Sequence, residues 1–195
     1  MKQLDGTGQK RLHRSWRRRT EGSVALLLDS VQNPFNVGAI VRSAAAFRVD
    51  HVWLSGATEP ISHPKTKKTA LGAERYLTFT VCDTAEAAVR DAQAQGYQVI
   101  GIELADTAVP LHEVVATSRV CLALGHEDRG LSAATLTLCD EVAFIPMLGK
   151  IGSLNVATAA AIACYEMRRH SWMSPAPPPG PAAARSHAVG IDLDA

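Results

Sequence analysis

The sequence predicts an α/β domain whose mainly parallel sheet is covered by helices on both faces. Short apolar runs alternate with helical patterns along residues 24–173. Most of these runs are continuously apolar, which is typical of strands buried on both faces, and alternation of strands with helices favours parallel pairing. A chain of 195 residues that is 47% hydrophobic can bury one sizeable core, so we expect a single domain with appendages.

The predicted domain consists of strands and helices in alternation. The strands are expected at residues 24–29, 51–54, 76–81, 97–102, 120–124 and 141–145. The helices are expected at about residues 38–47, 84–95, 132–138 and 154–169. Gly96 ends the second of these helices, because glycine readily adopts the left-handed conformation found after a helix. The last helix contains "VATAAAIAC", which is so uniformly small and apolar that it must pack closely on several sides.

The first 23 residues form a basic arm. They carry seven lysines and arginines against two acidic residues, a net charge of +5 that leaves −4 for the rest of a chain whose total is +1. A basic arm on a slightly acidic body predicts a polyanionic partner. Trp16 lies among the arginines, where an aromatic ring can stack on an exposed base while its neighbours contact phosphate. The expected contacts are Arg14, Arg17, Arg18 and Arg19, although a solubilising or disordered tail explains the same charge run equally well.

Composition disfavours several classes of protein. No apolar run is long enough to span a bilayer, and the N-terminus is basic where a signal peptide would be hydrophobic, so we expect a cytoplasmic protein. The four cysteines form no C-x-x-C pair and lie in apolar contexts, and the histidines are scattered, so we expect buried thiols and no metal site. Residues 174–195 hold five of the ten prolines without a regular apolar period, which predicts a disordered tail.

Ligands of parallel α/β folds bind beyond the carboxyl ends of the strands, and three of the loops expected there carry unusual polar residues. In the first loop, "SVQNPFNVGAIVRSAAAF", Asn33 and Pro34 start a turn, and Asn36 is expected to cap a helix that carries Arg42. A helix N-terminus with an added guanidinium suits a phosphate or another oxyanion. Because its apolar neighbours predict a mostly buried helix, we favour a functional role for Arg42 over a surface arginine.

The second and third loops follow the last two predicted strands. "LGHEDRGLS" contains Gly125, where the backbone can approach a ligand closely, then Glu127, and its Ser132 starts the next helix. "IPMLGKIGSLN" joins an apolar stretch, which resembles the wall of a small-molecule pocket, to Ser153 and Asn155, and either side chain can cap the last helix. The alternatives are a merely solvated Glu127 and a capping role alone for the third loop.

Familiar catalytic signatures are absent from the sequence. It holds no G-x-G-x-x-G fingerprint, Walker A loop, nucleophile elbow or zinc signature. This argues against dinucleotide-dependent, P-loop, serine-hydrolase and zinc-hydrolase mechanisms. Apolar pocket loops with backbone donors instead favour a cofactor that brings its own reactivity and mainly needs to be oriented.

Three stretches together resemble the sequence motifs of the SpoU (TrmH-like) branch of the SPOUT RNA methyltransferases. They are "NPFNVGAIVRS", "LALGHEDRGLS" and "IPMLGKIGSLNVATAAAI", in the family's order and with similar spacing. The segment "TALGAERYL" is also similar to one found in many members between the first two motifs. The resemblance covers about residues 24–169, nearly the whole predicted domain.

The resemblance implies a fold, a cofactor and a reaction. Members have an α/β domain whose C-terminal part is threaded into a deep trefoil knot, although general topology rules count against knots. They bind S-adenosylmethionine, usually as homodimers, and transfer its methyl group to a ribose 2′-hydroxyl of RNA. The uniformly small and apolar last helix is consistent with burial in a knot and a dimer interface.

The resemblance also implies roles for individual residues. Those that match catalytic positions of the family are Arg42, Asn36, Glu127, Ser153 and Asn155. The backbone expected to hold the cofactor lies around Ile102, Gly125, Ile145 and Leu154. Members act on tRNA or on ribosomal RNA, and the basic arm favours tRNA. Two alternatives stay open, an RNA-binding protein that has lost catalysis and a small-molecule α/β enzyme with a phosphate site at the Arg42 helix.

Overall fold

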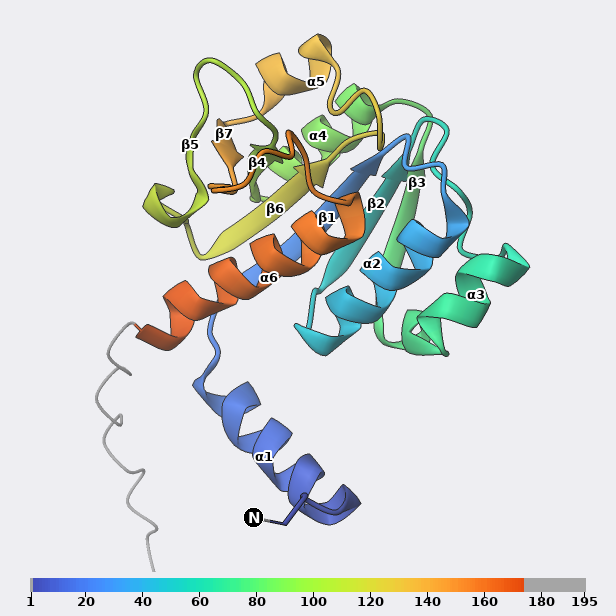
Figure 1. Cartoon of the computed structure of the whole chain (residues 1–195), viewed down its shortest axis with the longest axis vertical. Helices are drawn as coiled ribbons and strands as arrows, with labels where there is room; N and C mark the ends of the chain where they lie inside the picture. The colour runs from blue at the N-terminus through green and yellow to red at the C-terminus, as the bar shows by residue number, and fades with distance from the viewer. Residues whose placement is uncertain (1, 174–195) are drawn as a thin grey trace, which may run out of the picture.

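The computed structural model describes residues 2–173, and its centre is a seven-stranded sheet with strand order β3-β2-β1-β6-β4-β7-β5 (Figure 1). The strands are β1 Ser23–Asp29, β2 His51–Ser55, β3 Thr78–Cys82, β4 Gln98–Ile102, β5 Val109–Pro110, β6 Arg119–Leu124 and β7 Glu141–Phe144. Neighbouring strands of this sheet pair in parallel, which confirms the predicted architecture. The two-residue strand β5 was not predicted, because it is too short to show a periodic pattern.

Helices connect the strands. The helical elements are α1 Gly6–Arg19, α2 Pro34–Ala46, α3 Pro64–Ala70, η1 Ala73–Tyr76, α4 Ala85–Ala94, η2 Leu111–Glu113, α5 Ala133–Leu138 and α6 Val156–Met173. Side-chain caps set where two of them begin. The Thr84 hydroxyl accepts a hydrogen bond from the Ala87 N–H at 3.1 Å, and the Ser132 hydroxyl accepts one from the Thr135 N–H at 3.0 Å. Both helices therefore start where the sequence predicts.

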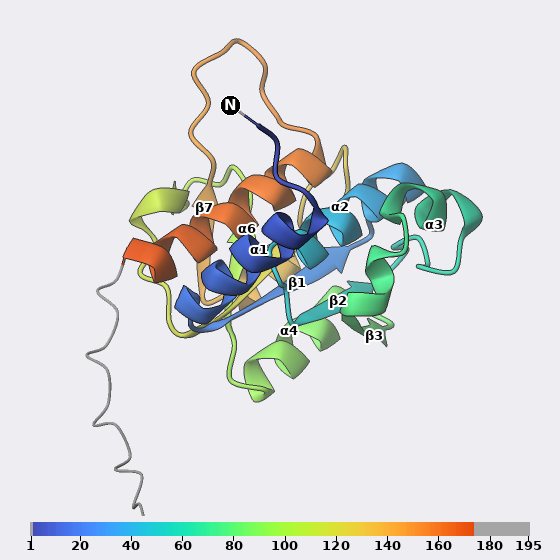
Figure 2. The same cartoon turned by 90° about the horizontal axis from the view of Figure 1, so that it is seen from below.

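The helices cover both faces of the sheet, as predicted (Figure 2). Successive side chains of a strand point to opposite faces, so β1 contributes to two separate cores. Leu26 and Leu28 pack with residues of α2 and α6 on one face. Leu27 packs on the other face with Trp53 and with Val89 of α4. Because both faces are covered, the ends of the strands and the loops that follow them are left to form a site.

The basic arm contains α1, which projects from the domain near the C-terminal end of α6 (Figure 1). No residue of α1 is buried. The contact with the domain is made near the end of this helix, where the ring centroids of Trp16 and Trp172 lie 5.3 Å apart. The indole N–H of Trp172 also donates to the Thr20 hydroxyl at 2.8 Å. The structure thus gives the arm a helix, which the charge run alone did not predict.

Helix α3 and the following turn η1 were also not predicted. Helix α3 has the polar sequence "PKTKKTA" and buries only Thr66 and Ala70, so it lacks an apolar stripe that would reveal it. It packs closely on α2 because Gly38 has no side chain there. A Cβ at Gly38 would lie 2.6 Å from the Thr66 carbonyl oxygen.

The remaining sequence expectations concern cysteines, membranes and the tail. Cys121 and Cys164 are buried and Cys82 and Cys139 are partly buried, and burial raises the pKa of the Cys164 thiol to about 12. Within residues 2–173, no helix is both long and apolar enough to cross a membrane. The same residues contain no cluster of histidine, cysteine and acidic side chains that could hold a metal ion. The predicted tail at residues 174–195 lies outside the described residues.

Candidate active site

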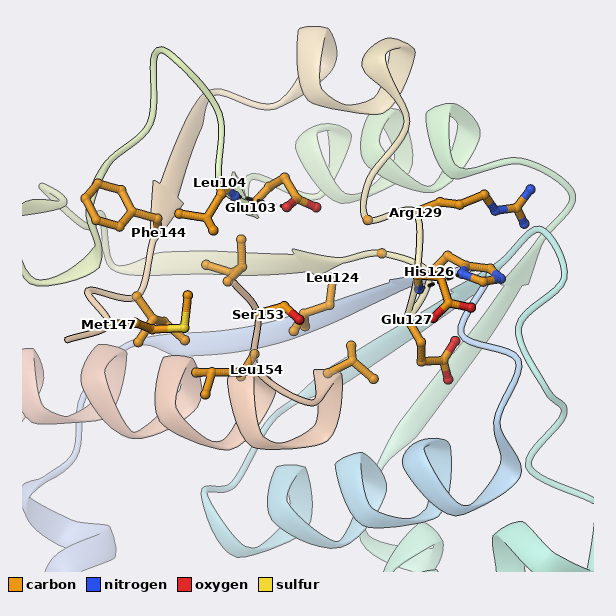
Figure 3. A pocket seen from close by; sticks show the side chains of 17 residues that line it. Glu103, Leu104, Leu124, His126, Glu127, Arg129, Phe144, Met147, Ser153 and Leu154 are labelled. Carbon is orange, nitrogen blue, oxygen red and sulfur yellow. Dashed lines mark hydrogen bonds between the residues drawn. The ribbon is translucent and has the colours of Figure 1, made fainter. Parts of the chain in front are cut away.

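A cavity of about 470 Å³ opens at the carboxyl ends of β4, β6 and β7. Ile102, Gly125, Ile145 and Leu154, the four expected cofactor contacts, all line it. Figure 3 shows Glu103 and Leu104 on one side of the cavity and Leu154 on the other, with Ser153 between them and Glu127 at one end. Parallel strands bring these residues together, because their carboxyl ends lie at the same edge of the sheet.

The loop after β6 forms one end of the cavity through a tight turn. The His126 N–H donates to the Gly130 carbonyl at 3.1 Å, and the Gly130 N–H donates back to the His126 carbonyl at 2.8 Å. This turn brings the chain so close to itself that a Cβ at Gly125 would lie 2.1 Å from the Gly130 carbonyl carbon. Only glycine fits at position 125 without moving the loop.

Glu103 holds this turn from the neighbouring strand end. Its carboxylate accepts hydrogen bonds from the Leu131 N–H and from the Leu104 N–H, each at 3.0 Å. Gly130 has a φ of +65°, and a Cβ there would lie 2.0 Å from the Glu103 carboxylate. Sequence reasoning missed Glu103, since nothing in its local pattern indicates a contact with a loop 28 residues further along the chain.

Three predicted catalytic residues form a continuous hydrogen-bonded chain beside the cavity. The Asn155 side-chain amide donates to the Asn36 side-chain oxygen at 3.0 Å, and the Asn36 amide donates to the Glu127 carboxylate at 3.0 Å. The Glu127 carboxylate also accepts hydrogen bonds from the backbone N–H groups of Asn33 at 3.0 Å and Gln32 at 3.3 Å. These hydrogen bonds join the three loops that carry the family motifs, which we call the signature loops. We name this set of Asn36, Glu127 and Asn155 the polar chain.

The environment of Glu127 favours its charged form. Burial raises the pKa of this carboxyl, but the hydrogen bonds from the Asn36 side chain and from backbone N–H groups outweigh burial and hold the pKa below its ordinary value. The interpretation of Glu127 as a merely solvated loop residue is therefore wrong, because its carboxylate joins the loop after β6 to the start of α2.

The two polar residues of the third loop have different roles: Asn155 caps α6, and Ser153 lines the cavity. The Asn155 side-chain oxygen accepts hydrogen bonds from the N–H groups of Ala157 at 2.9 Å and Thr158 at 3.3 Å, so Asn155 caps α6 while its amide group reaches Asn36. Ser153 lines the cavity, and the hydrogen bonds found among the described residues do not include its hydroxyl. Capping thus explains Asn155 but not Ser153.

Two expectations about α2 were wrong. Asn33, not Asn36, caps the helix, because the Asn33 side-chain oxygen accepts the Phe35 N–H at 2.9 Å and Pro34 occupies the first turn. Asn36 is left to contact Glu127. Arg42 is exposed, does not line the cavity and makes no hydrogen bond or ion pair with the residues that the structure describes. The apolar residues of α2 face the core, and Arg42 lies on the opposite side of the same helix.

The four expected RNA contacts on the arm lie away from the cavity. They are Arg14, Arg17, Arg18 and Arg19, all exposed on α1. The guanidinium carbon of Arg19 lies 5.4 Å from the centroid of the Trp16 ring, within the range of a cation–π contact. Figure 1 shows the C-terminal end of α1 near the C-terminal end of α6, whereas Val156 and Ala159 at the N-terminal end of α6 line the cavity. The structure thus separates the expected binding arm from the expected catalytic residues.

A parallel α/β sheet with a cavity enclosed by strand-following loops defines a class of proteins that bind a small molecule at the sheet edge. Within this class the chain belongs to the SpoU rRNA Methylase family, whose model matches residues 23–165. This match confirms the resemblance inferred from the three signature loops.

Two named relatives and one solved structure are each about one third identical in sequence to this chain. The "tRNA (guanosine(18)-2'-O)-methyltransferase" of Escherichia coli (strain K12) is 33% identical over 77% of this chain and 65% of its own length. The "23S rRNA (guanosine(2553)-2'-O)-methyltransferase RlmP" of Bacillus subtilis (strain 168) is 35% identical over 73% of this chain and 57% of its own. An AdoMet-bound rRNA methyltransferase from Sinorhizobium meliloti has a TM-score of 0.72 and 30% identity, over 78% of this chain and 58% of its own. The chain thus spans less than two thirds of the length of each of these relatives.

Proposed function

We propose that this protein transfers the methyl group of S-adenosylmethionine to a ribose 2′-hydroxyl of RNA, and that the RNA is a tRNA. The observation that carries the proposal is that the cavity, lined by the second and third signature loops and by the end of β4, lies beside the polar chain, which joins all three signature loops. The cavity can hold a small cofactor while the polar chain faces a polar substrate. We place this reaction in the cytoplasm, where unpaired cysteines persist.

The cavity suits S-adenosylmethionine in size and in charge. Its volume of about 470 Å³ lies within the range of small-molecule sites. Glu103, Glu127 and Asp128 contribute three carboxylates against the guanidinium of Arg129, and this excess of negative charge suits a sulfonium cation. Backbone around the four expected cofactor contacts would hold adenine, ribose and the methionine moiety. When bound, the cofactor supplies an activated methyl group on a good leaving group.

The protein's own residues would orient the ribose and stabilise the charge that develops on it. A guanidinium cation has no lone pair to accept a proton, so Arg42 acts by stabilising the developing alkoxide and by holding a neighbouring phosphate rather than as a general base. Its exposed position on α2 supports contact with an RNA lying across that helix. Asn36 and Glu127 would orient the reacting groups, Asn155 fixes Asn36, and Ser153 shapes the cavity.

We also infer that two copies pair through α6 and that the chain is threaded into a deep trefoil knot. Exposed apolar side chains on and just before α6 support the pairing, namely those of Leu154, Ile162 and Tyr165. Helix α6 follows β7, which lies beyond β4, yet it packs against β1, β6 and α2. This return of the chain across the sheet supports the knot.

The arm supports an RNA substrate, and in particular a tRNA. Its exposed arginines and Trp16 combine phosphate-binding charge with a ring on which a base can stack. Ribosomal RNA is the second candidate, since the Bacillus subtilis relative is named for 23S rRNA. A non-catalytic RNA-binding role is disfavoured, because the polar chain beside the cavity is intact.

The proposal is tested by incubating the wild type and an Arg42→Ala variant with methyl-labelled S-adenosylmethionine and either unmodified total tRNA or ribosomal RNA. The RNA is then digested to nucleosides and analysed by mass spectrometry. We expect the wild type to produce a labelled 2′-O-methylnucleoside in the tRNA pool, and Arg42→Ala to produce far less while still binding RNA. Label in the ribosomal pool alone would reassign the substrate. Wild-type turnover by Arg42→Ala would refute the role of this arginine.

A further inference from the structure

Helices α2 and α3 together present an exposed basic and aromatic surface beside the polar chain. Phe35 is 52% exposed at the start of α2, and the Lys65 ammonium of α3 lies 5.8 Å from the centroid of its ring. Lys68 follows on the next turn of α3 and is also exposed. Arg42 lies two turns after Phe35 on the same side of α2, because residues seven apart share a helix face. We call these residues, Phe35, Arg42, Lys65 and Lys68, the α2–α3 surface.

The turn η1 adds a second exposed aromatic ring beside a cation. It packs against both α2 and α3. Tyr76 is 75% exposed, and the guanidinium carbon of Arg75 lies 5.9 Å from the centroid of the tyrosine ring. The α2–α3 surface and η1 therefore present two aromatic rings, each paired with a positive charge, on neighbouring elements.

The charge of this region is opposite to that of the rest of the domain. Residues 60–77 hold four basic side chains, Lys65, Lys67, Lys68 and Arg75, against the single acidic Glu74. The chain beyond the arm is otherwise acidic, so the excess of positive charge is local. Single exposed rings or cations are ordinary on a solvated surface, but here two rings and their cations are gathered on three elements that pack together. Cations interleaved with aromatic rings are instead typical of surfaces that bind single-stranded nucleic acid.

We propose that the α2–α3 surface and η1 bind a single-stranded segment of the RNA substrate. Bases stack on Phe35 and Tyr76, and phosphates contact Lys65 and Lys68. Phe35 directly precedes Asn36, the middle member of the polar chain, so an RNA strand on this surface leads toward the residues expected to act on it. This inference rests on the proposed function, and it adds a binding surface separate from α1.

The test compares two double variants with a matched control. Lys65→Ala/Lys68→Ala removes charge, Phe35→Ala/Tyr76→Ala removes rings, and Arg90→Ala removes an exposed cation from α4 on the opposite face of the sheet. Fluorescence anisotropy measures the affinity of the full-length protein for a labelled single-stranded oligoribonucleotide and for the duplex of the same sequence, over a range of salt concentrations. Calorimetric titration with S-adenosylmethionine checks that each variant keeps its fold and its cofactor site.

The two double variants are expected to differ in their dependence on salt. The slope of log affinity against log salt is negative. Removing two phosphate contacts makes it less steep by about 1.4, since each contact on a single strand contributes about −0.7. Removing the rings weakens single-strand binding at least about fivefold per lost stacking contact, leaves the slope unchanged and weakens duplex binding less. Arg90→Ala is expected to match the wild type in both measurements.

Several outcomes would overturn the proposal. If the wild type methylates RNA but both double variants keep its affinity and slope, the surface does not bind RNA although the proposed function stands. If the ring variant changes the sedimentation of the protein but not its affinity for RNA, the surface is a contact between copies of the chain. If the wild type binds neither RNA nor S-adenosylmethionine, the proposed function fails together with this inference.

Discussion

Arg168 is the buried cation whose removal tests the packing around α2 and the arm. Its side chain on α6 is 3% exposed, and its guanidinium donates to three backbone carbonyls, those of Phe47 at 2.9 Å, Gly22 at 3.0 Å and Arg48. The Asp50 carboxylate lies 3.8 Å away. Two of the carbonyls follow the end of α2 and the third lies between α1 and β1. One side chain therefore ties α6 to α2 and to the segment that leads into the arm.

The effect of Arg168→Met can be estimated from these contacts. A hydrogen bond from a charged donor contributes about 1.5–3 kcal/mol, so three would contribute about 4.5–9 kcal/mol if nothing compensated for their loss. The loss is partly offset, because the variant no longer has to desolvate a buried charge and methionine keeps much of the apolar stem. Each carbonyl that loses its donor costs about 1–3 kcal/mol, so three of them, less this offset, leave a destabilisation of about 3–5 kcal/mol. We expect Arg168→Met to lower the free energy of unfolding by that amount.

Thermal unfolding measured by calorimetry or circular dichroism tests this estimate. For a domain of this size, each kcal/mol changes Tm by about 2–4 °C, so Arg168→Met should lower Tm by about 6–20 °C. The matched control is Arg169→Met. The adjacent Arg169 forms an ion pair with Glu166 at 2.5 Å, and because both side chains are partly exposed, we expect its loss to lower Tm by less than the loss of Arg168 does. Equal Tm values for the two variants would refute the structural role assigned to Arg168.

Three further predictions concern the site and the arm. Gly125→Ala should abolish S-adenosylmethionine binding in calorimetry while the protein stays folded, because the added Cβ would lie 2.1 Å from the Gly130 carbonyl carbon and displace the loop. Retained affinity would show that the loop is not part of the cofactor site. The pKa of Glu127 is lowered in the folded state, so its stabilising effect is present above the ordinary value of 4.5 and is lost as pH falls through the lowered pKa. The difference in unfolding free energy between the wild type and Glu127→Gln should therefore shrink on acidification, and a constant difference would contradict this linkage. Trp172→Ala should speed tryptic cleavage of the arm by removing the ring that contacts Trp16, without changing cofactor affinity; an unchanged cleavage rate would count against this anchor.

The sheet and much of the site were predictable because they depend on strong local patterns. Short apolar runs, most of them continuous, marked six of the strands, and parallel order brings the ends of β4, β6 and β7 to one edge. Ile102, Gly125 and Ile145 each follow or end one of these strands, so their meeting in one cavity follows from topology. Topology alone does not identify the ligand of the cavity. The assignment to S-adenosylmethionine depends on the resemblance of the three signature loops to the family motifs.

Other features depend on the side of a helix from which a side chain projects, or on contacts between residues far apart in the sequence. Local sequence patterns did not lead to either. The exposure of Arg42 was mispredicted because apolar neighbours were counted without regard to the side of the helix on which each lies. Pro34 in the first turn indicates that Asn33 is the cap, and this signal was present in the sequence. Glu103 gave no such signal, because its role depends on a loop that is distant in sequence and close in space.

We propose above that the cavity at the carboxyl ends of β4, β6 and β7 binds S-adenosylmethionine. Calorimetric titration of S-adenosylmethionine into the wild type, Ile145→Arg and Leu148→Arg tests it most directly. Both substitutions add the same charge to one loop, but Ile145 lines the cavity whereas Leu148 is fully exposed and does not. We predict saturable binding to the wild type, at least about tenfold weaker binding to Ile145→Arg, equivalent to about 1.4 kcal/mol, and unchanged binding to Leu148→Arg. Absence of binding to the wild type, or equal affinity in the two variants, would contradict the claim.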